Sequence, residues 1–165
     1  AAGLAAIEAV AKAVPAMQVG AGTVTRASEV AQVQNAGARF ALSPGSTSTL
    51  IDAVLAAGLP FIPGVGTPSE AMAMRDAGFT LMKCFPAAQL GGVEVLKAWG
   101  GPLPDLRFCP TGGVSLDNMA QFLALPNVAM VGGSWLTPAA AVAAGDSAQI
   151  TRLAREATLA AQSVA

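Results

Sequence analysis

The sequence predicts an α/β fold in which parallel strands alternate with helices. Continuously apolar segments alternate with helical patterns along the chain, and most of these segments begin about 20 residues apart, the spacing of compact strand–helix units. Three helical patterns end in the same dipeptide just before the next strand, at Ala36-Gly37, Ala57-Gly58 and Ala77-Gly78. Apolar residues make up 53% of the chain and charged residues only 12%, which is normal for a buried parallel sheet.

Short apolar segments mark the strands. Six of them are predicted, in chain order: Gln18–Val24, Arg39–Ser43, Pro60–Pro63, Phe79–Phe85, Leu106–Thr111 and Val128–Val131. Because helices separate them, we expect the strands to be parallel and joined by right-handed crossovers.

Helical patterns fill the intervals between the strands. They cover Leu4–Ala13, Ala27–Ala36, Ser48–Ala57, Ser69–Ala77, Gly92–Trp99, Leu116–Leu123 and Ser147–Gln162. Glycine after a helix supplies the left-handed conformation that stops it, which explains the three Ala-Gly pairs. Thr67-Pro68-Ser69-Glu70 has the pattern of a capping box with proline at the first helical position. Ser115 and Asp146 are predicted N-caps of later helices.

The strand ends decide between two parallel architectures. A (β/α)₈ barrel needs eight strands and typically about 250 residues, whereas six strands also suit an open doubly wound sheet. Every predicted strand end carries glycine or proline and most carry a hydroxyl, and the active sites of barrels lie at the carboxyl ends of strands. We therefore expect a single barrel domain over residues 1–165.

Composition excludes several classes of function. The net charge is −1 with no basic run, so the sequence gives no sign of nucleic-acid binding, and it contains no histidine, the commonest metal ligand. Cys84 and Cys109 lie in apolar runs without a partner at ligand spacing and are predicted to be small buried side chains. The longest uncharged stretch, Asn118–Gly145, is cut by prolines and glycines into helix, strand and helix rather than a membrane span. A soluble cytoplasmic protein without a signal peptide is the expectation.

Lys83 is the most informative residue. It lies in the apolar run Thr80–Pro86 and is one of only three lysines. Burying an ammonium group is costly, and burial depresses the pKa of a lysine, which frees its lone pair to attack a carbonyl carbon. Taken alone, a strand lysine more often packs its stem on the strand while its amine reaches water. The residues around Lys83 favour the nucleophile instead.

Two Gly-Gly turns follow the last two predicted strands. Thr111-Gly112-Gly113 and Gly132-Gly133-Ser134 both place glycines beside a hydroxyl residue. Loops after the final strands of a barrel commonly bind a phosphate through main-chain amides, although each turn could also be an ordinary tight turn. Together with Lys83, the turns indicate Schiff-base chemistry on a phosphorylated substrate.

Other strand-end residues complete the predicted site. Thr23 and Thr111 are suited to hydrogen-bond a keto-acid carboxylate, although Thr23 is equally well explained as a small strand residue. Pro44 and Phe85 are expected to form apolar walls that keep the amine dry, a role compatible with simple packing. Further basic residues fall on helices or at the opposite strand ends and are predicted to be solvated: Lys12, Arg26, Arg39, Lys97, Arg152 and Arg155.

Five motifs occur in order along the chain: Val19-Gly20-Ala21-Gly22-Thr23-Val24, Ser43-Pro44-Gly45, Lys83 with Phe85-Pro86-Ala87, Arg107-Phe108-Cys109-Pro110-Thr111-Gly112-Gly113, and Gly132-Gly133-Ser134-Trp135. With these motifs, essentially the whole chain resembles the 2-keto-3-deoxy-6-phosphogluconate (KDPG) aldolase and 4-hydroxy-2-oxoglutarate (KHG) aldolase family. The resemblance implies a TIM-type (β/α)₈ barrel, usually trimeric, and a class I aldolase that needs no metal or other cofactor. It implies cleavage of KDPG to pyruvate and glyceraldehyde 3-phosphate in the Entner–Doudoroff pathway, and many members also act on 4-hydroxy-2-oxoglutarate.

The resemblance also implies roles for individual residues. Lys83 matches the Schiff-base lysine. Residues that match those around the pyruvyl group are Thr23, Pro44, Phe85 and Thr111. Residues that match the phosphate-binding rim are Gly112, Gly113, Gly133 and Ser134.

One departure from the family pattern concerns proton transfer. The family's first strand, first helix and second strand precede the first residue of this chain, and the second strand carries the general acid/base glutamate and a substrate-binding arginine. The expectation is therefore an N-terminally truncated barrel that is impaired as an isolated chain. Two other functions stay open: a phosphate-binding barrel acting as an isomerase or synthase without a covalent lysine, and a non-catalytic assembly module.

Overall fold

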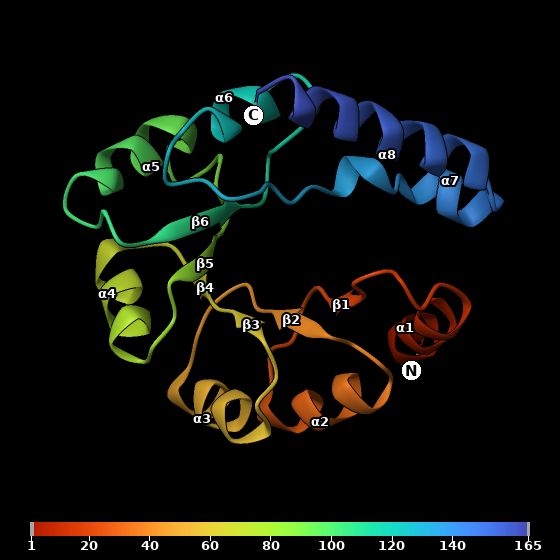
Figure 1. Ribbon diagram of the computed structural model, residues 1–165, viewed down its shortest axis with the longest axis horizontal. Coiled ribbons are helices and arrows are strands. Elements are labelled where there is room, and N and C mark those ends of the chain that lie inside the picture. The colour runs from red at the N-terminus through yellow and green to blue at the C-terminus, as the bar shows by residue number, and fades with distance from the viewer. Residues whose placement is uncertain (1, 165) are drawn as a thin grey trace. The chain divides into compact units, whose positions relative to one another are not determined.

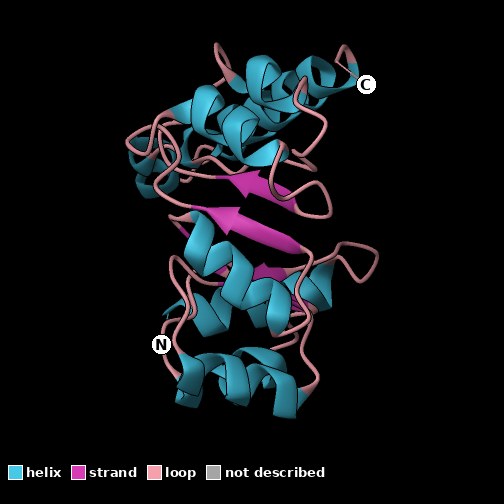
Figure 2. Cartoon of the chain, turned by 90° about the vertical axis from the view of Figure 1, so that its left-hand side faces the viewer, coloured by secondary structure: helices cyan, strands magenta, loops and turns pink. Residues whose placement is uncertain are grey.

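The computed structural model describes residues 2–164 and contains two compact units (Figure 1). The first unit ends at Lys83 and the second begins at Cys84. Both consist of helices and short strands, and the strands are much shorter than the helices (Figure 2). The α/β class predicted from the sequence is confirmed, and both strand pairs of the first sheet, β1 with β2 and β2 with β3, are parallel.

The first unit alternates helices with strands. Its elements are α1 (Ala2–Ala13), β1 (Gly20–Ala21), α2 (Ala27–Asn35), β2 (Phe40–Leu42), α3 (Ser48–Ala57), β3 (Phe61–Ile62), β4 (Gly64–Val65), α4 (Pro68–Asp76) and β5 (Leu81–Cys84), whose last residue begins the second unit. Strands β1, β2 and β3 form a parallel sheet in that order, with Gly20 opposite Phe40 and Ala41 opposite Phe61. Strand β5 is tied to the segment before β4, because the Lys83 N–H donates to the Pro63 carbonyl at 2.8 Å.

Apolar side chains from α2, α3 and the sheet form the core of this unit. Helices α2 and α3 lie side by side against one face of the sheet (Figure 1). Val30 of α2, Val54 of α3 and Ala41 of β2 are among its buried members. The period of the helices and the continuously apolar strands therefore place their apolar residues in one core.

The helix ends follow the chemistry predicted for them. Gly37, Gly58 and Gly78 all have positive φ, so the three Ala-Gly pairs end their helices as expected. At the start of α4, the Thr67 side chain accepts a hydrogen bond from the Glu70 N–H and the Glu70 carboxylate accepts one from the Thr67 N–H. The predicted capping box is confirmed.

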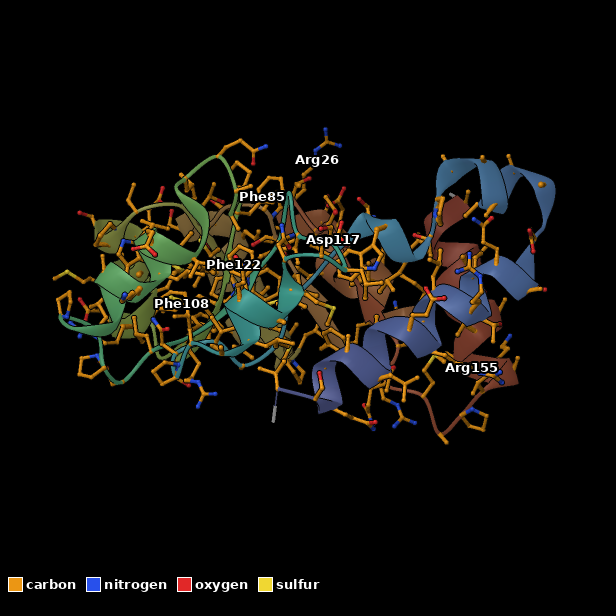
Figure 3. All side chains as sticks on the ribbon, turned by 90° about the horizontal axis from the view of Figure 1, so that it is seen from above. Arg26, Phe85, Phe108, Asp117, Phe122 and Arg155 are labelled. Atoms are coloured by element: carbon orange, nitrogen blue, oxygen red, sulfur yellow. The ribbon has the colours of Figure 1, made fainter. Side chains whose placement is uncertain are left out.

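The second unit is mainly helical. It contains α5 (Gly92–Gly100), β6 (Arg107–Pro110), α6 (Met119–Leu123), the 3₁₀ helix η1 (Ser134–Leu136), α7 (Ala139–Ala144) and α8 (Ser147–Gln162). Helix α8 contacts η1, α6 and α7. Phe108 of β6 and Phe122 of α6 are buried in this unit (Figure 3), and the Phe108 ring packs edge-on against Trp99 with centroids 5.4 Å apart.

Three local predictions for the second unit are wrong. Val128–Val131 is not a strand: only isolated parallel bridges form there, between Phe108 and Val128 and between Thr111 and Gly132. The sixth helix begins at Met119 rather than Leu116. Ser115 is not its N-cap, because that position is taken by Asn118, whose side chain accepts a hydrogen bond from the Ser115 N–H at 2.9 Å. A turn stabilised by Asn118 therefore occupies the position expected for the first helical turn.

Two further features concern the uncharged stretch and helix α8. Within residues 2–164, no helix is long and apolar enough to cross a membrane. The stretch Asn118–Gly145 is divided among α6, η1 and α7, but the strand expected in its middle does not form.

The N-cap predicted at Asp146 is confirmed, because its carboxylate accepts a hydrogen bond from the Gln149 N–H at 2.9 Å.

Candidate active site

Lys83 is buried on strand β5. Its neighbours Met82 and Cys84 are fully buried, and Lys83 itself is only 7% exposed. The run Leu81-Met82-Lys83-Cys84 forms a strand as expected from its apolar character. Lys83 as a whole is thus largely removed from water, as expected for a nucleophilic lysine.

Two serine side chains fix the loop that follows β2 and contains Pro44, because both form hydrogen bonds with the main chain of Gly64. We call this pair of bonds the serine lock. Ser43 is completely buried, and its hydroxyl accepts a hydrogen bond from the Gly64 N–H at 3.1 Å. The Ser46 hydroxyl donates to the Gly64 carbonyl at 2.9 Å. A Cβ at Gly64 would overlap the main chain of Pro44 and Gly45, so only glycine permits this close approach. Pro44 is therefore presented, half-buried, on a rigid loop at the carboxyl end of β2.

Thr23 follows β1 and is exposed. It lines a groove of about 440 Å³ within the first unit, whose walls come from α1, β1 and α2. The Val24 N–H donates to the Leu42 carbonyl at 2.9 Å, which fixes the backbone next to Thr23. The prediction that Thr23 lies at the carboxyl end of its strand is confirmed, although the strand is shorter than the predicted Gln18–Val24.

Glu29 lies in the same groove but serves as a helix cap. Its carboxylate accepts hydrogen bonds from the Thr25 N–H at 2.8 Å and the Arg26 N–H at 3.1 Å. The hydrogen bond from the Thr25 main chain holds the pKa of Glu29 below its usual value. A carboxylate engaged in this way is poorly suited to take up protons near neutral pH.

The loop Thr111-Gly112-Gly113 in the second unit is held mainly by main-chain hydrogen bonds. The Thr111 N–H donates to the Cys84 carbonyl at 3.0 Å. The carbonyls of Thr111 and Gly112 accept from the Ala87 N–H at 2.8 Å and the Ala88 N–H at 3.0 Å. The Asn118 side chain donates to the Gly113 carbonyl at 2.9 Å.

These bonds set the direction of two amides. In a planar trans peptide the N–H points away from the preceding carbonyl. Because the Thr111 and Gly112 carbonyls both point toward Ala87 and Ala88, the N–H groups of Gly112 and Gly113 both point to the opposite side. Gly112 and Gly113 have φ of 92° and 77°, a conformation that residues with a side chain rarely adopt. Successive amides aimed the same way form an anion-binding concavity.

The remaining predicted site residues lie in the same unit. Phe85 is near the turn at Gly112, and Gly133 and Ser134 belong to the second Gly-Gly turn. A Cβ at Gly112 would lie 3.3 Å from the Phe85 ring, so the half-buried ring packs against this glycine. A Cβ at Gly133 would overlap the Trp135 ring. Ser134 is exposed at the start of η1, where its carbonyl accepts from the Thr137 N–H at 3.2 Å.

The two cysteines are buried and form no disulfide. Cys84 is fully buried, and this burial, with a smaller contribution from Cys109, raises the pKa of its thiol to about 11. The prediction of small buried side chains is confirmed. The basic side chains predicted to be solvated are indeed exposed, as Arg26 and Arg155 illustrate (Figure 3).

Sequence reasoning missed several residues that hold individual strand-end loops in place within each unit. Ser43 and Gly64 entered only as residues at predicted strand ends, and Ser46 was not singled out at all. Asn118 was included only as the edge of an uncharged stretch. Each acts through a partner 5 to 21 residues away, and no local pattern announces such a bond.

Comparisons with known proteins identify the family of this chain. A model of the KDPG and KHG aldolase family matches residues 1–153. The chain belongs to this family. It is 53% identical over 151 residues to the 2-dehydro-3-deoxy-phosphogluconate aldolase of Pseudoalteromonas atlantica, covering 92% of this chain and 70% of that protein. It is 51% identical to the KHG/KDPG aldolase of Escherichia coli K12, covering 92% of this chain and 71% of that protein.

Solved structures of the family resemble this fold. The KDPG aldolase of Legionella pneumophila superimposes with a TM-score of 0.87 at 43% identity, over 91% of this chain and 73% of that one. In that structure pyruvate was captured at low pH as a covalent carbinolamine intermediate. The aldolase of Zymomonas mobilis ZM4, solved with 3-phosphoglycerate, superimposes with a TM-score of 0.85 at 40% identity, over 93% of this chain and 72% of that one.

Proposed function

We propose that this protein is a class I aldolase that cleaves KDPG to pyruvate and glyceraldehyde 3-phosphate. The observation that carries the proposal is the buried Lys83 on β5, in a chain 43% identical to an aldolase in which pyruvate forms a covalent carbinolamine. The same chemistry extends to 4-hydroxy-2-oxoglutarate, in keeping with the names of relatives such as the E. coli KHG/KDPG aldolase.

The Lys83 amine begins the reaction. Its lone pair attacks the C2 carbonyl of the substrate to give a carbinolamine, which loses water to form an iminium ion. The C4 hydroxyl then gives its proton to a base and the C3–C4 bond breaks, releasing glyceraldehyde 3-phosphate. The electron pair of that bond moves toward the iminium nitrogen to form an enamine. Protonation at C3 and hydrolysis release pyruvate and restore Lys83.

The other site residues bind the substrate. Thr23 and Thr111 donate hydrogen bonds to the keto-acid carboxylate. Pro44 and Phe85 are apolar walls that limit hydration of the amine. The N–H groups of Gly112 and Gly113, which point to the same side of their loop, bind the phosphate together with Gly133 and Ser134.

The finer architecture belongs to the same proposal. Alternating strands and helices with parallel pairing, and the likeness to solved KDPG aldolases, support a TIM-type (β/α)₈ barrel. The chain spans 70% to 71% of the two curated relatives described above. A homotrimer is the proposed assembly, and sedimentation equilibrium tests it: a mass other than three chains contradicts it. A cytoplasmic location stays a prediction from the sequence.

Trapping with borohydride tests the mechanism. Incubation with pyruvate and sodium borohydride reduces the imine to a stable secondary amine, so the peptide containing Lys83 gains a carboxyethyl group. Lys12 and Lys97 are exposed and serve as controls within the same chain. Omission of borohydride, or the Lys83→Met variant, removes the label.

The outcome separates the three candidate functions. A folded protein in which Lys83 stays unlabelled overturns the aldolase mechanism. Retained turnover of a phosphorylated sugar by Lys83→Met indicates an isomerase or synthase. Absence of both labelling and phosphate binding indicates an assembly module. Circular dichroism of each variant shows that the fold is intact.

A further inference from the structure

The Thr111 hydroxyl is held by two groups of Cys109. It donates a hydrogen bond to the Cys109 carbonyl at 3.3 Å, and its oxygen lies 3.8 Å from the Cys109 sulfur. Cys109 is only 3% exposed, whereas Thr111 is half-buried and so accessible to a ligand. A hydroxyl has one proton to donate and lone pairs to accept, so the thiol can donate to the oxygen while the hydroxyl proton is used elsewhere.

Gly132 leaves the space that this hydroxyl occupies. The two residues pair in an isolated parallel bridge, and the Gly132 N–H donates to the Pro110 carbonyl at 2.9 Å. A Cβ at Gly132 would lie 2.6 Å from the Thr111 hydroxyl oxygen and 3.3 Å from its methyl carbon. Gly132 does not have positive φ, so its backbone conformation suits any residue. The space beside Thr111 is therefore the reason for glycine at this position.

We propose that Gly132 and Cys109 are positioning residues that hold the Thr111 hydroxyl in the rotamer that binds the keto-acid carboxylate. The inference rests on the proposed aldolase function, in which Thr111 donates to that carboxylate. When substrate arrives, the hydroxyl proton turns from the Cys109 carbonyl to the carboxylate, and the heavy atoms stay in place. The Cys109 thiol then donates to the hydroxyl oxygen and keeps it oriented.

Replacement of Gly132 has the larger expected effect. The Cβ of Gly132→Ala displaces the Thr111 hydroxyl, so the pyruvate concentration for half-maximal borohydride labelling of Lys83 rises at least 10-fold. Gly101→Ala is the matched control in the same unit, because Gly101 has φ of −67° and its Cβ would meet only the Ala98 carbonyl oxygen, at 4.0 Å. This control leaves the half-maximal concentration within 2-fold of the wild type.

Replacement of Cys109 separates hydrogen bonding from packing. Cys109→Ala removes the side-chain donor, and the half-maximal pyruvate concentration rises about 3-fold, consistent with the loss of one weak hydrogen bond. Cys109→Ser restores a donor and returns the value to within 2-fold of the wild type. Equal weakening by both variants shows that the sulfur only fills space, and this outcome overturns its positioning role.

A double-mutant cycle of Gly132→Ala and Thr111→Val distinguishes positioning of the Thr111 hydroxyl from a purely structural role of Gly132. In a Thr111→Val background the hydroxyl is absent, so Gly132→Ala causes no further loss of pyruvate affinity. The same 10-fold loss in both backgrounds means that Gly132 acts only on the fold and overturns the inference. Melting temperatures measured for all four proteins identify any unfolded variant, and if Gly132→Ala does not fold, the Cys109→Ala and Cys109→Ser pair still tests the positioning of Thr111.

The failure of this inference is distinguishable from that of the proposed function. If wild-type Lys83 is not labelled, the aldolase mechanism fails. If the wild type is labelled and Thr111→Val weakens pyruvate binding while Gly132→Ala does not, Thr111 acts as proposed and only its positioning by Gly132 is wrong.

Discussion

The two units hold the loops at their strand ends by different means. In the first unit the side chains of Ser43 and Ser46 lock the loop after β2 onto Gly64. In the second unit main-chain bonds from Ala87 and Ala88 hold the Thr111–Gly113 loop. In the first unit, hydrogen bonds from serine side chains fix a loop that carries an apolar residue, Pro44. In the second unit, the Thr111 and Gly112 carbonyls accept the hydrogen bonds that fix the loop, and the Gly112 and Gly113 N–H groups point to its other side, where they suit a phosphate.

The glycines of the two loops differ in the same way. Gly64 has no positive φ and is required only because the main chain of Pro44 and Gly45 comes close. Gly113 has φ of 77°, and its Cβ would also overlap the Ala88 side chain. A side chain at Gly113 therefore meets two obstacles and a side chain at Gly64 meets one.

Gly113→Ala is expected to have the largest effect. A left-handed conformation costs a residue with a side chain about 1–3 kcal/mol, and the overlap with Ala88 adds to this cost. We expect unfolding in urea to show a loss of about 3 kcal/mol, with weaker binding of inorganic phosphate by calorimetry. Gly101→Ala is the control. A loss no greater than that of the control would mean that the loop shifts freely and that its amides are not fixed.

Gly64→Ala follows, because space is its only obstacle. Overlap with main-chain atoms cannot be relieved by a rotamer change, so we expect a loss of about 2 kcal/mol in urea unfolding. Gly45→Ala is the matched control in the same loop: its Cβ would meet nothing within 4 Å and its φ is not positive. That variant should be neutral or slightly stabilising. Equal stability of the two variants would refute the close approach at Gly64.

The sequence predicted the regular parts of both units well. The bounds of α3 and α8 agree with the expected Ser48–Ala57 and Ser147–Gln162; Gly58 ends α3, and Asp146 caps the start of α8. Strands were predicted too long, as with Gly20–Ala21 inside the expected Gln18–Val24. An apolar run shows where a strand can be buried but not which residues pair with a neighbour, and pairing defines the strand.

The same limit applies to the candidate site. Lys83 could be singled out because a charged residue within an apolar run is unusual and is visible in the sequence itself. Strand β4 was missed because Pro63, which has no N–H to donate, looks like the end of a strand. Ser43 was missed as part of the serine lock because its partner Gly64 is 21 residues away. Contacts of this kind depend on packing between elements, and one sequence does not specify them.

The buried thiol of Cys84, the first residue of the second unit, is expected to make the protein less stable at alkaline pH. Its pKa is raised from 9.0 to about 11 in the folded protein. As the pH rises, the thiol ionises first in the unfolded protein, which favours unfolding. The contribution of the protonated thiol to the free energy of unfolding is therefore complete below pH 9 and is lost as the pH rises toward 11. The full shift corresponds to about 3 kcal/mol, of which roughly 2 kcal/mol is lost by pH 11. Unfolding in urea from pH 8 to 11 should therefore fall more steeply for the wild type than for Cys84→Ala, and parallel curves would contradict the burial of this thiol.

Ser43→Ala tests the serine lock of the first unit. Removal of the hydroxyl leaves the buried Gly64 N–H without its acceptor, and an unsatisfied buried donor costs about 1–3 kcal/mol. We expect a loss of about 1.5 kcal/mol in urea unfolding. Ser46→Ala, at a half-buried position, should cost less than 1 kcal/mol because water can replace its hydroxyl. The reverse order would show that the serine lock is centred on Ser46.

The smallest expected difference compares one helix cap in each unit. Thr67 begins α4 with a reciprocal capping box, whereas Asp146 begins α8 with a single hydrogen bond to the Gln149 N–H. Loss of an N-cap costs typically about 1 kcal/mol. In Thr67→Ala the Glu70 carboxylate still accepts from the Gly66 and Thr67 N–H groups, so part of the cap remains. Asp146→Ala removes both the acceptor and a negative charge that favours the helix N-terminus. Urea unfolding should thus show a loss of about 1 kcal/mol for Asp146→Ala and less for Thr67→Ala; a larger loss for Thr67→Ala would mean that Glu70 depends on the threonine to hold its position.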